Sequence, residues 1–190
     1  MACFCLSCSA QDITLPPAQK TGGKPLLDAL NERQSTREFS DKDLDNQTLS
    51  DLLWAAYGFN REDKRTAPSA NNKQPFSVYA VLKSGVYLYD AKANTLVLKA
   101  QGDFRTATGS QDFVAVAPLN LVYVADLTKN SAEAAAVDVG FISQNVYLYC
   151  ASADLATVVR GWFNKDDLKK ALKLGENEAP ILTQTVGHKK

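Results

Sequence analysis

The chain has 190 residues, of which 45% are apolar and 22% charged, and its 21 basic and 21 acidic residues cancel to zero formal charge. This composition is ordinary for a globular domain and is sufficient for one sizeable hydrophobic core. Without a basic stripe, we expect no nucleic-acid partner. The chain lacks the run of roughly 18 apolar residues that a membrane span requires. Near-neutral charge favours self-association over mutual repulsion.

Cysteine use is uneven, because Cys3, Cys5 and Cys8 crowd the amino terminus while Cys150 stands alone. This is not a disulfide framework, and without a nearby histidine we expect no metal site. The small residues around position 10 suit a signal-peptidase site, but the charged region that begins an export signal is missing. We therefore interpret residues 1–24 as an N-terminal arm or the remnant of an export signal. The compartment stays open between cytoplasmic and exported (periplasmic).

The first half of the chain reads as an extended arm followed by two helices. Residues 11–24 are polar and contain paired prolines and paired glycines, which indicates the arm. Apolar residues at helical spacing predict helices over about 25–33 and 46–57, with Gly58 as a left-handed stop. The polar stretch 60–75, with two prolines, is expected to be a loop.

The second half alternates strands with two further helices. A long helix over 131–151, capped by Ser131, is apolar around most of its circumference and is expected to be buried on most sides. Asn164 begins a lysine-rich helix that we expect to stop at Gly175. The mixture indicates an α+β fold with an antiparallel or mixed sheet. The predicted strands are 76–82, 86–89, 95–98, 119–125, 156–159 and 181–186, and 104–111 is ambiguous.

Three segments carry candidate chemistry. In an extended chain, Arg33, Ser35 and Arg37 would point the same way and suit a phosphate monoester, or they form a solvated polar stretch. The amide- and hydroxyl-rich loop 65–75 suits the polar edge of a planar cofactor, or it satisfies its own backbone. Gly161 allows a close approach of backbone to a ligand, or it serves an edge turn.

Together these segments resemble the FMN-dependent nitroreductases, and most closely the branch that includes azoline-oxidising peptide dehydrogenases. The resemblance covers about residues 26–187. The stretches that carry it are Arg33-x-Ser35-x-Arg37, Leu52–Arg61, Arg65–Ala70, Gly85–Asp90, Asp138–Asn145 and the turn at Gly161.

The resemblance implies that residues 25–190 form a nitroreductase-like FMN-binding domain, with a central, mostly antiparallel sheet flanked by helices. It also implies a homodimer with FMN at the subunit interface, where the flavin N5 carries the chemistry and no side chain is catalytic. The implied FMN residues are Arg33, Gln34, Ser35, Arg37 and Lys189 (or His188) at the phosphate and ribityl end, Pro68, Ser69, Ala70 and Asn72 along the flavin, Gln144 in the interface helix, and the backbone of Val159, Arg160 and Gly161 at the N5 edge.

Arg160 departs from the family pattern, because many nitroreductases carry an acidic residue there. A cation at this place either stabilises the reduced flavin or points to solvent. The implied function is hydride transfer from NAD(P)H through FMN to a small electron-poor acceptor of nitroaromatic or quinone type. The alternatives are an FMN dehydrogenase acting on a peptide azoline or another C–N bond, and a non-catalytic flavin-binding dimer.

Overall fold

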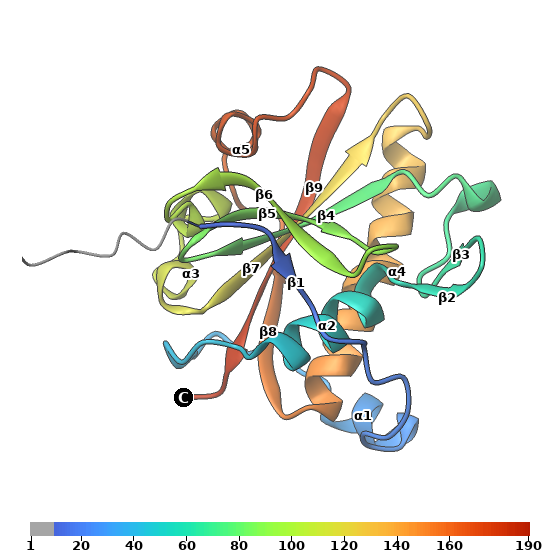
Figure 1. Ribbon diagram of the computed structural model, residues 1–190, viewed down its shortest axis with the longest axis vertical. Helices are drawn as coiled ribbons and strands as arrows, with labels where there is room; N and C mark the ends of the chain where they lie inside the picture. Colours follow the sequence, from blue (N-terminus) through green and yellow to red (C-terminus); the bar gives the residue numbers. More distant parts are fainter. Residues whose placement is uncertain (1–9) are drawn as a thin grey trace, which may run out of the picture.

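A computed structural model describes residues 10–190, which fold around one seven-stranded sheet (Figure 1). The sheet order is β1-β6-β5-β4-β7-β9-β8, and every pairing within it is antiparallel. The strands are β1 (Ile13–Thr14), β4 (Phe76–Leu82), β5 (Gly85–Asp90), β6 (Thr95–Gln101), β7 (Leu119–Asp126), β8 (Leu155–Arg160) and β9 (Glu178–His188). The helices are α1 (Leu26–Glu32), α2 (Asn46–Tyr57), α3 (Phe113–Val116), α4 (Ala132–Ser152) and α5 (Lys165–Leu172), with 3₁₀ turns η1 (Ala70–Asn72) and η2 (Arg105–Thr108).

Helices α2 and α4 cover one face of the sheet, and α1 lies against α4 (Figure 1). The main core lies between these helices and the sheet, where Leu52, Leu53 and Ile142 are fully buried against Leu121 and Tyr123. The opposite face carries α5 and η2, and Leu168 of α5 packs there in a second core. Because successive side chains of a strand alternate between faces, β7 supplies residues to both cores and is buried at every residue except the last, Asp126. The α+β class and the central position of 119–125 are thus confirmed.

Side-chain caps fix where three helices begin. The Asp45 carboxylate accepts a hydrogen bond of 2.7 Å from the Thr48 backbone N–H at the start of α2. Ser131 caps α4 in the same way, as predicted, and the Asn164 side chain accepts from two N–H groups of α5. These caps satisfy backbone donors that the first turn of a helix leaves free.

Two predictions of how a helix ends are wrong. Gly58 ends α2 in an extended conformation (φ −70°, ψ 175°), not a left-handed one. Glycine is needed there for space, because a Cβ would lie 2.8 Å from the Trp54 carbonyl oxygen. Helix α5 stops at Lys173, which itself adopts the left-handed conformation (φ 55°), two residues before Gly175.

Two other expectations also need correction. The stretch 60–75 is not all loop, because β2 (Phe59–Arg61) and β3 (Lys64–Arg65) form a small separate hairpin. Helix α4 is not buried on most sides, because Val137 is 61% and Phe141 44% exposed.

The N-terminal arm is attached to the domain, since Ile13 of β1 pairs with Leu96 of β6. The cluster of Cys3, Cys5 and Cys8 and most of the suggested export-signal remnant lie outside the described residues. Among residues 10–190, no helix is both long and apolar enough to cross a membrane.

Candidate functional site

Tyr147 of α4 joins two of the segments that the sequence singled out. Its hydroxyl lies 2.7 Å from Ser35 Oγ and accepts a 3.0 Å hydrogen bond from the Val159 backbone N–H. The Arg33 guanidinium carbon lies 5.3 Å from the centre of the Tyr147 ring. A backbone hydrogen bond from Thr36 to the Thr157 carbonyl holds the segment beside β8. Arg33 and Ser35 therefore lie on the same side, together with the end of β8.

This Tyr147 cluster (Arg33, Ser35, Tyr147 and Val159) is cationic. Arg33 is half-buried and Arg37 is exposed, and no carboxylate in the described part of the chain pairs with either. A guanidinium group near a hydroxyl is a donor pair that suits a phosphate, and Arg37 follows two residues after Ser35 in the same segment.

Gln34 and Lys189 flank the Tyr147 cluster. Both line a small recess that also reaches Tyr147. The Lys189 ammonium forms an ion pair with Asp154, and this contact lowers the pKa of the Asp154 carboxyl. Lys189 is therefore near the cluster, but its charge is already paired.

The loop that holds Pro68, Ser69, Ala70 and Asn72 lies elsewhere. The Ala70 N–H donates to the buried Asp138 carboxylate at 3.2 Å. Within the loop, Ser69 Oγ accepts from the Gln74 N–H, and the Asn72 amide donates to the Asp63 carbonyl at 3.3 Å. Asn72 also has a positive φ of 55°, a conformation that asparagine tolerates better than most residues. The loop is thus preformed, and Pro68 at its start is exposed.

Within one chain this loop and the Tyr147 cluster are separated along α4. Asp138 and Tyr147 are nine residues apart in the helix, which corresponds to about 14 Å and two and a half turns. The two side chains therefore leave the helix on opposite sides. Gln144 is half-buried on the surface between them, where Val137 and Phe141 are exposed. One chain alone does not bring all the predicted residues together.

Arg160 places its side chain on the other face of the sheet from the Tyr147 cluster. It is only 6% exposed and donates to the Thr108 carbonyl at 2.8 Å and to Asn120 Oδ1 at 2.9 Å. Burial lowers the pKa of this guanidinium to about 10, and no described carboxylate pairs with it. Neither sequence interpretation of the side chain holds, because it reaches neither solvent nor the cluster. Its role is to tie the end of β8 to the segment that contains η2.

Gly161 directly follows β8 and is exposed. A Cβ built there would meet only the Leu182 side chain, at 3.7 Å. The chain itself therefore leaves room for a side chain at this position. A glycine here keeps the backbone accessible to a ligand beside Val159.

Sequence reasoning missed the buried polar network beneath the cluster. Tyr123 donates a 2.6 Å hydrogen bond to Gln184 Oε1, and Gln184 Nε2 donates to Thr157 Oγ1 at 3.1 Å. All three residues are almost fully buried. A glutamine in the middle of the predicted strand 181–186 was the available signal.

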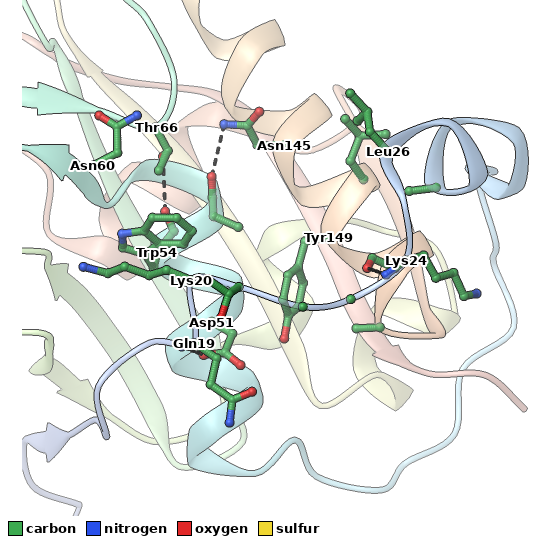
Figure 2. A pocket seen from close by; sticks show the side chains of 18 residues that line it. Gln19, Lys20, Lys24, Leu26, Asp51, Trp54, Asn60, Thr66, Asn145 and Tyr149 are labelled. Atoms are coloured by element: carbon green, nitrogen blue, oxygen red, sulfur yellow. Dashed lines mark hydrogen bonds between the residues drawn. The ribbon is translucent and has the colours of Figure 1, made fainter.

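A sizeable cavity lies apart from the cluster, between the N-terminal arm, α2 and α4 (Figure 2). Its volume is about 610 Å³. Trp54 of α2 and Tyr149 of α4 contribute aromatic walls, and Lys20 of the arm contributes a cation. None of the residues predicted to bind FMN lines it.

The sequence and fold of the chain are similar to those of known proteins. The profile of the Nitroreductase family matches residues 30–188. The nitroreductase-family protein MJ1384 of Methanocaldococcus jannaschii is 30% identical over 196 residues, covering 94% of this chain and 96% of that protein. A crystal structure of a nitroreductase-family protein (reut_a1228) from Ralstonia eutropha JMP134 is 43% identical, with a TM-score of 0.89 over 97% of this chain and 92% of that one.

A chain of the Escherichia coli microcin synthetase McbBCD complex, solved with truncated pro-MccB17 bound, shares the fold. It is 19% identical, with a TM-score of 0.72 over 90% of this chain and 76% of that one. The profile match and the two closer relatives agree with the resemblance in the sequence, and the chain belongs to the nitroreductase family.

Proposed function

We propose that the protein is an FMN-dependent oxidoreductase that passes hydride from NAD(P)H to a small electron-poor acceptor of nitroaromatic or quinone type. The observation that carries the proposal is the Tyr147 cluster, where the Arg33 guanidinium, which has no carboxylate partner among the described residues, lies near the Ser35 hydroxyl and the end of β8. Family membership supports a flavin oxidoreductase in general.

The residues present fit the phosphate end of FMN. Arg33 and Arg37 supply charge and have no carboxylate partner in the described part of the chain, and Ser35 supplies a hydroxyl that is hydrogen-bonded to Tyr147. The open space at Gly161 suits the close approach of a flat ring to the backbone. Lys189 is the weaker member of this set, because Asp154 already pairs with it.

We further propose that a second copy of the chain completes each site. Pro68, Ser69, Ala70 and Asn72 would then contribute from the partner subunit, because α4 separates this loop from the Tyr147 cluster of its own chain. An apolar surface for such an interface exists: Leu27 of α1 is 76% exposed, and Val137 and Phe141 of α4 are also exposed. Helix α1 packs directly on α4, so these side chains belong to neighbouring elements. Gln144 lies on the same surface of α4.

The oligomeric state can be tested with one charge placed in this surface. Leu27→Glu is expected to convert a dimer to a monomer in light scattering coupled to size exclusion. Val116→Glu is the matched control, because Val116 is 44% exposed on α3, which lies well away from α1 (Figure 1). A monomeric wild-type protein would remove the interface part of the proposal.

In this proposal the protein holds the cofactor in position, and the cofactor carries out the reaction. Bound FMN would supply hydride acceptance and donation at its N5, and no side chain needs to act as an acid or a base. Arg33 and Arg37 neutralise phosphate charge, and Tyr147 keeps Ser35 and the Val159 backbone in register. Arg160 anchors the backbone that leads into Gly161 from the far face of the sheet.

The double substitution Arg33→Ala, Arg37→Ala tests the phosphate assignment. Two charge-assisted contacts at a partly exposed site contribute about 1 to 2 kcal/mol in total, so FMN should bind roughly five- to thirtyfold more weakly in a fluorescence titration. Arg61→Ala is the control, because Arg61 is exposed on the β2–β3 hairpin and its side chain bonds, among the described residues, only to Asn60. Unchanged FMN affinity in the double variant would contradict the assignment.

One observation favours a second candidate, the azoline or C–N dehydrogenase. The fold is shared with a chain of a complex solved with truncated pro-MccB17 bound. A flavin that dithionite reduces but NAD(P)H does not would favour this candidate over the reductase.

A further inference from the structure

We propose that the cavity between the N-terminal arm, α2 and α4 binds a flat aromatic compound that carries a negative charge. Its volume of about 610 Å³ falls within the range of sites that hold small molecules. It is lined by none of the residues proposed to bind FMN, so it is a second site on the chain.

The walls of the cavity include two aromatic rings from different helices. Trp54 comes from α2 and Tyr149 from α4, and both are half-buried with surface facing the cavity (Figure 2). The Trp54 indole N–H is already committed to the Phe59 carbonyl at 3.1 Å, which fixes the orientation of the ring. Fixed aromatic surfaces favour a flat ligand that stacks against a ring or meets its edge.

The charges that line the cavity leave one cation free. Asp51 Oδ1 accepts from the Gln19 N–H at 2.7 Å and from Gln47 Nε2 at 2.9 Å, so this carboxylate is already used. Lys24 is paired with Glu32 at the mouth.

Lys20 has no carboxylate partner in the described part of the chain, and its ammonium lies 5.6 Å from the centre of the Trp54 ring. A carboxylate or similar anion on the ligand would complete this pairing beside the aromatic wall.

The arm forms the roof that presents Lys20. It is fastened at one end by the Gln19–Asp51 hydrogen bond and at the other by the Lys24 N–H, which donates to Ser152 Oγ at 2.8 Å. Between these points residues 20–23 cross the cavity (Figure 2). Gly22 in this span has a φ of 92°, and a Cβ there would meet no atom within 4 Å. The site is thus preformed, with Lys20 held at its rim.

Trp54 fluorescence gives a direct test that needs neither flavin nor turnover. The chain has two tryptophans, and Trp162 is 78% exposed and outside the cavity, so Trp162→Phe leaves Trp54 as the only reporter. The probes are para-nitrobenzoate and its neutral analogue para-nitrobenzamide. We expect saturable quenching by both, with tighter binding of the benzoate. Lys20→Gln should weaken the benzoate about two- to fivefold, the scale of an exposed ion pair, and leave the benzamide unchanged.

Two matched variants sharpen the result. Lys83→Gln removes an exposed lysine that does not line this cavity and should change nothing. Ala55→Leu fills part of the cavity and should weaken both probes. Absence of saturable quenching, or equal affinity for the two probes with no effect of Lys20→Gln, overturns the proposal. If Ala55→Leu fails to fold, the effect of Lys20→Gln on benzoate affinity still tests the proposal.

The same titration separates this proposal from the flavin proposal. In the Arg33→Ala, Arg37→Ala variant the benzoate affinity should match that of the parent, whether or not FMN binds. If saturating FMN instead excludes the benzoate competitively, the cavity belongs to the flavin site and the claim of a second site is wrong.

Discussion

Replacing Tyr147 by phenylalanine removes the hydroxyl that holds the proposed FMN site together. The half-buried Val159 N–H then loses its acceptor, and Ser35 Oγ loses a partner at 2.7 Å. An unsatisfied, partly buried donor costs about 1 to 3 kcal/mol, whereas the exposed Ser35 hydroxyl can turn to water at little cost. We therefore expect the free energy of unfolding to fall by about 1 to 2 kcal/mol.

Urea denaturation of the flavin-free protein measures this change, with an unaltered m-value as the check that only stability has moved. Tyr149→Phe is the matched control on the same helix, because no hydrogen bond of its hydroxyl is found among the described residues. Its effect should stay within about 0.5 kcal/mol. Equal effects of Tyr147→Phe and Tyr149→Phe would refute the role given to the Tyr147 hydroxyl.

Three other predictions rest on separate parts of the structure. Asp45→Ala should destabilise the protein by about 1 kcal/mol through loss of the cap on α2, whereas Asp45→Asn should retain most of the cap. The hydrogen bond from the Thr48 N–H lowers the pKa of Asp45, so this contribution is present at neutral pH and is lost as the pH falls below the ordinary range of an aspartate; urea titrations at pH 7 and pH 3 should show the difference between wild type and Asp45→Ala shrinking. Arg160→Ala should cost about 2 to 4 kcal/mol in urea denaturation, because it leaves the Thr108 carbonyl without a donor and opens a cavity; a loss below 1 kcal/mol would contradict the anchoring role. Burial raises the pKa of the Cys150 thiol, so peptide-resolved alkylation should label Cys150 only after unfolding, and rapid labelling of the native protein would disprove its burial.

The sequence predicted helices and strands well where the signal depends only on neighbouring residues. Ser131 and Asn164 cap the helices they were expected to cap, because a cap depends only on the next few residues. The strand 76–82 is found with the predicted bounds. The left-handed stop was misassigned at Gly58, because this glycine is required by the nearby Trp54 backbone and not by its own dihedral angles.

The parts that sequence reasoning missed depend on contacts between distant segments. Arg160 was interpreted by its place in a family motif, but strand alternation and the acceptors Thr108 and Asn120 put its side chain beneath the sheet. Helix α4 was expected to be buried on most sides because its apolar residues include Val137 and Phe141, which are exposed in a single chain. The cavity under the arm depends on hydrogen bonds over more than 30 residues of sequence, which no local pattern encodes.

The cluster was predictable in part. Arg33 and Ser35 were expected to share one side, and they do, around Tyr147. The separation of this cluster from the Ala70 loop was not foreseen. The loop contacts α4 at Asp138 and the cluster contacts it at Tyr147, and these tertiary contacts are not encoded by a local sequence pattern. This separation is what makes a second subunit part of the proposed site.

The visible absorption spectrum of the protein, recorded after incubation with FMN and desalting, tests the central claim most directly. The proposal predicts retained flavin bands that bleach when NADH or NADPH is added in the absence of oxygen and return when a quinone or nitroaromatic acceptor follows. A protein that retains no flavin after this treatment would contradict the assignment of the Tyr147 cluster as an FMN site and the oxidoreductase function that depends on it.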